Sequence, residues 1–171
     1  MKFTVRNTFN TDVDTYWREI FFSEEYNSRL YAEALGFKGF ELIELTGSTG
    51  ERRTRTMRTE PAADAPAVVR KLIGDSLTYT ERGTWEPETK LWSYAIETNK
   101  LSDKVYIGGT LWAEPRGDGR CERIAEIEIQ VKVFGVGGAV ERFIEKTTRD
   151  SYVKAAKFTN EFIDEKGLRG T

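Results

Sequence analysis

One long amphipathic segment near the C-terminus constrains the fold more than any other part of the chain. From Gly138 to Gly167, apolar and small residues recur at spacings of three and four, the period of a helix with one apolar face. They are Val140, Phe143, Ile144, Thr147, Ser151, Tyr152, Ala155, Phe158, Thr159, Phe162 and Ile163. A helix of roughly 28 residues spans about 42 Å, so a wide apolar surface must cover this face.

The residues before this helix predict such a surface, because most of them follow the two-residue period of β-strands. A weak alternation over residues 2–9 predicts a first strand. Turn-forming residues then separate paired segments and predict three hairpins, namely 40–45 with 52–59, 77–85 with 91–98, and 104–114 with 120–133. The chain therefore supplies about seven antiparallel strands, enough to wrap around one helix.

Two short helices are predicted between the first strand and the first hairpin. Thr11 or Asp12 is a candidate N-cap for VDTYWREIF, Ser23 caps SEEYNSRLYAEAL, and Gly36 ends the pair. Residues 61–76 interrupt the strands with two prolines and a short apolar run, which predicts a covering flap. The expected fold class is α+β: a curved antiparallel sheet wrapped around a long C-terminal helix.

Composition narrows the classes of function. A net charge of -2 over 171 residues disfavours nucleic acid as a partner. The chain contains no histidine, which is the commonest general base and metal ligand, and Cys121 is its one cysteine. We therefore expect no metal, no cofactor and no histidine-dependent triad. The N-terminus lacks the apolar run of a signal peptide, so a cytoplasmic protein is expected.

Four stretches of sequence carry a resemblance to known proteins. They are APAVVRKLIGDSLTYTERGTW, residues 92–98, GGTLWAEPRGDGR, and VFGVGGAVERFIEK at the start of the long helix. With the order of elements, they resemble the START-like, helix-grip (SRPBCC) superfamily, which includes polyketide cyclases and lipid-transport domains, and look most like a bacterial branch of it. The segment WEPETKLWSYAIETNKLSDKV is more loosely similar to PRELI-type phospholipid carriers.

The resemblance implies one START-like domain over residues 1–171, with an apolar cavity between the sheet and the long helix. It implies binding or transport of a hydrophobic or amphipathic small molecule, a lipid in the first instance, without catalysis and with at most transient membrane contact. Two alternatives stay open, because a fold does not settle an activity. One is a polyketide cyclase or aromatase-like enzyme. The other is a protein-interaction module with a filled core and exposed Tyr106 and Trp112.

Alternation along the strands predicts which residues face the cavity. The predicted ligand-binding residues of the sheet are Arg53, Arg55, Met57, Tyr79, Trp92, Tyr94, Ile96, Ile107, Gly109, Leu111, Ile127 and Ile129. The helix contributes Phe143, Thr147, Ser151, Tyr152 and Ala155. Small side chains where two layers meet can leave unfilled volume, and Gly109, Ala125, Thr147, Ser151 and Ala155 are of this kind. The alternative interpretation of the same residues is an ordinary core.

Polar residues give three further hypotheses. Arg53 and Arg55 share the parity of Met57, so a buried guanidinium there would need an anionic partner such as a ligand carboxylate or phosphate. The alternative is a solvated edge strand whose arginines prevent edge pairing. Residues 135–138 are interpreted as a strand-to-helix corner rather than an anion site. Tyr79, Glu81 and Arg82 are candidates for acid–base chemistry in an enzyme.

Overall fold

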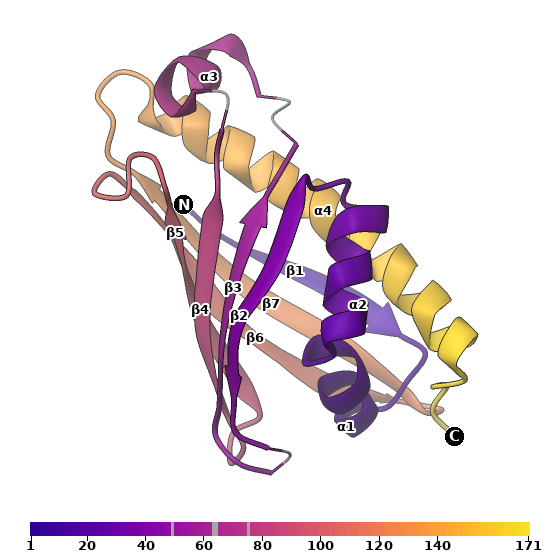
Figure 1. The fold of residues 1–171 in the computed structure, drawn as a ribbon. Coiled ribbons are helices and arrows are strands. Elements are labelled where there is room, and N and C mark those ends of the chain that lie inside the picture. The colour runs from indigo at the N-terminus through magenta and orange to yellow at the C-terminus, as the bar shows by residue number, and fades with distance from the viewer. Residues whose placement is uncertain (49, 63–64, 75) are drawn as a thin grey trace.

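The computed structural model describes residues 1–48, 50–62, 65–74 and 76–171 (Figure 1). The predicted turn at 46–50 and the predicted flap at 61–76 therefore each include positions outside the described residues. In chain order the strands and helices are β1 (Lys2–Phe9), α1 (Val13–Thr15), η1 (Tyr16–Phe21), α2 (Glu24–Arg29), η2 (Leu30–Ala34), β2 (Gly39–Thr46), β3 (Arg53–Glu60), α3 (Ala67–Ile73), β4 (Tyr79–Glu86), β5 (Leu91–Thr98), β6 (Val105–Gly117), β7 (Arg120–Val131) and α4 (Gly137–Lys166).

The strands form one seven-stranded antiparallel sheet in the order β1-β7-β6-β5-β4-β3-β2. The three predicted hairpins are β2–β3, β4–β5 and β6–β7, and β1 closes the order by pairing with β7. The sheet is curved, and α1, α2 and α4 lie on its concave side (Figure 1). The α+β architecture expected from the sequence is confirmed, including the long final helix that crosses the sheet.

The two short helices after β1 each begin as an α-helix and continue as a π-helical turn, α1 into η1 and α2 into η2. Their N-caps are side chains, as predicted: Asp12 Oδ1 accepts from the Thr15 amide at 2.9 Å and Ser23 Oγ accepts from the Tyr26 amide at 3.2 Å. Gly36 ends the pair with a φ of 64°, a left-handed conformation that glycine adopts without steric cost.

The long helix α4 is packed unevenly along its length. Its C-terminal half buries Ala155, Phe158, Thr159, Phe162 and Ile163 in the core. Each large apolar side chain buried there contributes about 1.5–3 kcal/mol. Its N-terminal half buries little beyond its first turn, because the residues from 143 to 152 are half-buried or exposed. Only the C-terminal half is therefore sealed against the sheet.

The α2 helix is held against α4 by a mixed contact. Arg29 donates to both carboxylate oxygens of Glu165, at 2.8 and 3.0 Å, and lies over the Phe158 and Phe162 rings. The Tyr26 hydroxyl lies 2.6 Å from Thr159 Oγ1, which itself donates to the Ala155 carbonyl. These contacts hold the C-terminal half of α4 against α2.

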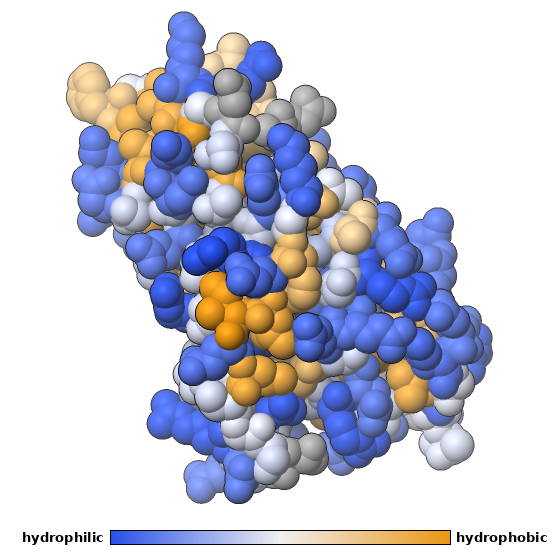
Figure 2. Space-filling view, in the orientation of Figure 1, coloured by the Kyte–Doolittle hydropathy of each residue, from blue (hydrophilic) through white to orange (hydrophobic). Residues whose placement is uncertain are grey.

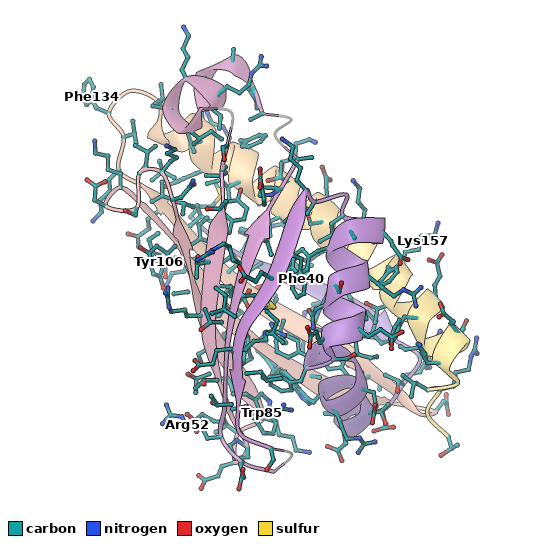
Figure 3. The ribbon with its side chains drawn as sticks, viewed as in Figure 1. Phe40, Arg52, Trp85, Tyr106, Phe134 and Lys157 are labelled. Carbon is teal, nitrogen blue, oxygen red and sulfur yellow. The ribbon has the colours of Figure 1, made fainter. Side chains whose placement is uncertain are left out.

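The two faces of the sheet follow the predicted alternation. Ile107, Leu111, Ile127 and Ile129 are buried on the concave face. On the convex face Tyr106 is exposed, as Figure 3 shows, and Trp112 donates from Nε1 to Glu114 at 2.9 Å. The predicted inward and outward sets of β6 and β7 are thus confirmed.

Candidate functional site

The inner face of the sheet is ordered in levels that run from the hairpin tips to α3. On β5, Trp92 pairs across the strands with Trp85 and Leu111 at the lower level. Tyr94 stands one level higher and Ile96 above it, since side chains two residues apart lie on the same face. Three kinds of side chain therefore follow one another along the concave face: aromatic, polar and aliphatic.

The lower level is filled by aromatic residues, which we call the aromatic block. They come from β1, the α1–η1 segment, β4 and β5, and are Phe9, Tyr16, Trp17, Phe21, Phe22, Trp85 and Trp92. Ring centroids lie 4.9 Å apart for Trp17 and Phe21 and 5.2 Å apart for Phe21 and Trp92, and the rings meet edge to face. Gly83 leaves the space that the Trp92 ring occupies. This end of the interior is ordinary core.

Above the aromatic block, a polar belt crosses the concave face. It consists of Arg55, Glu81, Tyr94 and Tyr152. Arg55 is 4% exposed and donates to Glu81 Oε1 at 3.1 Å and to the Phe21 carbonyl at 2.6 Å. Because β3 lies between β2 and β4, it is not an edge strand, and the solvated-edge interpretation of its arginines is wrong.

The tyrosines of the polar belt are shifted in their acid strength. Burial, with smaller contributions from nearby Tyr152 and Glu81, raises the pKa of Tyr94 well above its usual value. Burial also raises the pKa of Tyr152, although neighbouring Arg123 opposes that shift. Both hydroxyls are protonated at neutral pH, as ordinary tyrosines are, and the two lie within hydrogen-bonding reach of each other.

The level above the polar belt, next to α3, is buried less deeply than the aromatic block. We call it the upper region: its half-buried residues are Tyr79, Ile96, Val105, Phe143 and Ile144, and its buried residues are Met57, Ile107 and Ile129. Ile96, Val105 and Ile144 pack against the core but stay partly exposed to solvent. Burial raises the pKa of Tyr79 to about 12. The upper region is therefore a mostly apolar surface that solvent still reaches.

The structure distributes the predicted ligand-binding residues among these levels. The upper region contains Met57, Tyr79, Ile96, Ile107, Ile129 and Phe143. The polar belt contains Arg55, Tyr94 and Tyr152, and Gly109, Ile127 and Ser151 lie at the same height. The lower part of the concave face contains Arg53, Trp92, Leu111 and Ala155. The set is therefore divided between a packed half and an incompletely packed half.

Four of the five predicted small residues do not line a space between the layers. Thr147 is exposed, and its hydroxyl donates within the helix to the Phe143 and Ile144 carbonyls. Gly109 does not leave room for a ligand, because a side chain there would collide with the Glu126 carbonyl of β7. Ala125 and Ala155 are buried in filled core. Of the five, Ser151 remains half-buried beside the polar belt.

Sequence reasoning missed Arg123, which lies on the concave face in β7. It is 8% exposed, donates to Asn7 Oδ1 at 2.6 Å, and lies over the Tyr152 ring at 4.6 Å. The available signal was its parity with Ala125 and Ile127, which were both expected to face inward.

Of the candidates for acid–base chemistry, Tyr79 and Glu81 face inward, whereas Arg82 is exposed and pairs with Glu97.

Two open grooves lie on the surface of the described residues. One, of about 620 Å³, is on the convex face and includes Thr56, Thr84, Ser93 and Tyr106. The other, of about 460 Å³, runs between α2 and α4 beside Arg29. Neither lies between the concave face and the N-terminal half of α4.

The described residues contain no cluster of three acidic or cysteine side chains that could hold a metal ion, and no helix among them is long and apolar enough to cross a membrane.

The fold is shared with solved structures at low sequence identity. The Zhui aromatase/cyclase from Streptomyces sp. R1128 matches with a TM-score of 0.67 at 13% identity, over 98% of this chain and 95% of that chain. Norcoclaurine synthase from Thalictrum flavum matches with a TM-score of 0.67 at 16% identity, over 96% and 87%. A START superfamily protein from Mycobacterium smegmatis matches with a TM-score of 0.58 at 9% identity, over 96% and 97%. The chain thus has the START-like, helix-grip fold.

Comparison by sequence places the chain in a family. A search of curated protein sequences finds no match. Residues 4–163 match the family described as "Protein of unknown function (DUF2505)". Because this match spans nearly the whole chain, the chain belongs to the DUF2505 family.

Proposed function

We propose that this protein binds and carries a hydrophobic or amphipathic small molecule, a lipid in the first instance, in the upper region. The observation that carries the proposal is the contrast between the two halves of the interior. The aromatic block fills the lower half, whereas Ile96, Phe143 and Ile144 of the upper half are only half-buried. Apolar surface left in this state gains free energy when an apolar ligand covers it.

The polar belt would orient such a ligand. Binding sites for small molecules combine an apolar lining with a few placed polar groups. The belt supplies Arg55 and the Tyr94 hydroxyl directly below the upper region, and its Glu81 carboxylate lies at the height of Ile96. A ligand would then lie with its polar end on the belt and its apolar part toward α3. The fold supports this arrangement, since solved relatives by fold include enzymes and START proteins.

Native mass spectrometry of the purified protein, followed by a fluorescence binding assay with a lipid probe, tests this function. Ile144→Trp fills the upper region from α4 and should abolish binding. Val153→Trp, on the 69% exposed side of the same helix, is the matched control and should bind like the natural protein. The proposal fails if no lipid co-purifies and no probe binds, or if Ile144→Trp binds as well as Val153→Trp.

We also propose that the ligand is exchanged during transient contact with a membrane, at the end of the molecule that bears α3. Phe134, in the loop before α4, is 103% exposed and points away from the ribbon (Figure 3), and Val68 of α3 is also exposed. Figure 2 shows apolar residues gathered at this end, bordered by hydrophilic ones. Exposed apolar patches that are bordered by polar residues are typical of surfaces that contact a partner or a membrane.

The charges around this end favour an anionic membrane. Exposed basic residues gather around this end, in α3, in the loops before β6 and α4, and in the first turns of α4: Arg70, Lys71, Lys100, Lys104, Lys132 and Arg142. Asp103 is an exposed acidic residue in the same loop as Lys100 and Lys104. Lys104 and Lys132 are adjacent, since the Lys132 amide donates to the Lys104 carbonyl at 2.7 Å. Each basic residue near an anionic surface contributes about 1 kcal/mol to binding.

Sedimentation with lipid vesicles tests the membrane contact. Vesicles containing phosphatidylserine should retain the protein, and pure phosphatidylcholine vesicles should retain much less. Phe134→Ser should weaken retention several-fold, whereas Val153→Ser should not. Equal retention of the two variants would contradict the contact. Because neither change touches the upper region, lipid-probe binding should be unaffected and reports separately on the carrier function.

A second function stays open because one observation favours it. An enzyme resembling a polyketide cyclase or aromatase needs an inward tyrosine or carboxylate with a shifted pKa, and the buried Tyr94 meets this condition beside Glu81. Incubation with a linear polyketide-type compound, followed by mass spectrometry of the recovered ligand, distinguishes the two. Chemical change that Tyr94→Phe abolishes would favour the enzyme, and recovery of unchanged ligand favours the carrier.

A further inference from the structure

The concave face carries more positive than negative charge. Three guanidinium groups point inward from the strands, those of Arg53, Arg55 and Arg123. Glu81 is the one acidic side chain of the strands that faces the same way. Its carboxylate is already engaged by Arg55 at 3.1 Å. The interior side of the sheet therefore holds two guanidinium charges without an acidic partner among the strand residues.

Arg123 is the clearer of the two. It is 8% exposed, it donates to the neutral Asn7 amide oxygen at 2.6 Å, and the neutral Tyr16 hydroxyl lies beside it. The Phe9 and Tyr152 rings stack on the guanidinium, at 5.1 and 4.6 Å from Cζ, but aromatic faces offset only part of the cost of burying a charge. Its Nε donor has no partner among the described residues. Such a group is stabilised most by an anion.

Arg53 and Arg55 repeat the pattern on β3. They lie two residues apart on the same face, and the Arg53 guanidinium stacks on Phe22 at 4.2 Å. The Nε donors of both are buried and without a partner. Burial, and to a smaller extent repulsion from Arg55, lowers the pKa of Arg53. Arg53 on β3 and Arg123 on β7 therefore carry charged hydrogen-bond donors that border the polar belt from below and have no partner among the described residues.

We infer that the ligand is an anionic amphiphile, whose carboxylate or phosphate head rests on the polar belt between Arg55 and Arg123 while its apolar chain fills the upper region. The inference rests on the proposed function and adds the charge of the ligand to it. Guanidinium groups bind carboxylate and phosphate oxygens through charge-assisted hydrogen bonds, and the Tyr94 and Tyr152 hydroxyls can donate to the same head.

A series of ligands that share the same sixteen-carbon alkyl chain but differ in the polar head tests this inference. Hexadecanoic acid, hexadecyl phosphate and hexadecanol are compared by displacement of a neutral fluorescent lipid probe from the natural protein, at a pH where the acid is ionised. At least one anionic ligand should bind about tenfold or more tightly than the alcohol, and comparison of the two anions distinguishes carboxylate from phosphate. An alcohol that binds within about twofold of both anions overturns the inference.

Two variants locate the charge. Arg123→Gln should reduce the preference for the anion several-fold, whereas Arg6→Gln, on the exposed side of β1, should leave it unchanged. If Arg123→Gln does not fold, as judged by circular dichroism, Tyr152→Phe takes its place, because it removes a proposed donor to the same head and the Tyr152 side chain is only half-buried. Binding of all three ligands with equal affinity leaves the carrier function standing and removes this inference. Binding of none removes both.

Discussion

Among single residues, the Arg55–Glu81 pair is the contact on which the concave face depends most. Both groups face inward and join β3 to β4, and the guanidinium also donates to the Phe21 carbonyl of η1. The pair thus ties the sheet to the first helical segment. Removing one partner of a fully buried ion pair costs about 3–5 kcal/mol, and less is expected here because Glu81 is 20% exposed whereas Arg55 is buried.

The replacement Glu81→Gln should therefore destabilise the fold by up to about 3 kcal/mol, as measured by urea denaturation. Glu97→Gln is its control, because Glu97 forms an exposed ion pair with Arg82 at 3.3 Å on the opposite face. Exposed pairs contribute about 0–1 kcal/mol. A loss of stability no larger for Glu81→Gln than for Glu97→Gln would contradict this account of the belt.

Gly83 gives a second prediction at the same scale. The Trp92 ring occupies the space that a side chain at Gly83 would need. Gly83→Ala should displace the ring and lower the free energy of unfolding by about 1–3 kcal/mol. In Gly39→Ala the new methyl group would lie 3.6 Å from Glu60 Cβ, an ordinary contact. Thermal denaturation of the two variants compares them, and equal melting temperatures would show that the aromatic block is not tightly packed.

At the scale of elements, the two halves of α4 differ in burial although they form one continuous helix. Its C-terminal half is part of the core through Phe158, Phe162 and Ile163. Its N-terminal half covers the upper region without sealing it. Ser151 and Ala155, one helical turn apart, lie on either side of this change. The same substitution at the two positions should therefore have different effects.

Ala155→Leu adds volume to filled core, since Ala155 is 7% exposed, and should destabilise the protein by about 1–3 kcal/mol. Ser151→Leu extends into the incompletely packed level, and should leave stability nearly unchanged while weakening lipid-probe binding. Chemical denaturation and the fluorescence assay measure the two effects. A large loss of stability in Ser151→Leu would show that no space is available there.

On the scale of the whole molecule, the half-buried tyrosines of the concave face and α4 make the free energy of unfolding depend on pH in the alkaline range. Burial raises the pKa of Tyr79 to about 12, and it raises those of Tyr94 and Tyr152 above the ordinary value of 10.0. The unfolded chain therefore loses these protons first as the pH rises. Their contribution to stability is complete below the unfolded pKa and is lost as the pH rises through the folded values.

Urea denaturation midpoints should accordingly fall as the pH rises from about 10 toward 12. Tyr79→Phe removes one of the ionising groups, so its midpoint should fall less steeply over the same interval. The measured quantity is the difference between the natural protein and this variant in the slope of the denaturation midpoint against pH. The titration of lysines is common to both proteins and cancels in this difference. Identical slopes would exclude Tyr79 as a source of the dependence.

The sequence by itself determined the order and type of the elements and the two faces of most strands. Periods of two and three to four residues are local properties, so the alternation of β7 and the apolar stripe of α4 could be predicted without coordinates. The parity of Arg55 with Met57 likewise predicted which arginines of β3 face inward. The ends of the hairpin strands and of α4 agree with the predicted ranges to within three residues.

Only the tertiary structure decided which inward residues are packed and which remain open. Whether Gly109 leaves room or admits a neighbouring backbone depends on how closely β7 approaches, and whether Thr147 faces the sheet depends on the rotation of α4. The pairing of Arg55 with Glu81, and the lack of an acidic partner for Arg123, depend on which strands become neighbours. These are contacts between residues far apart in sequence, which no local period records.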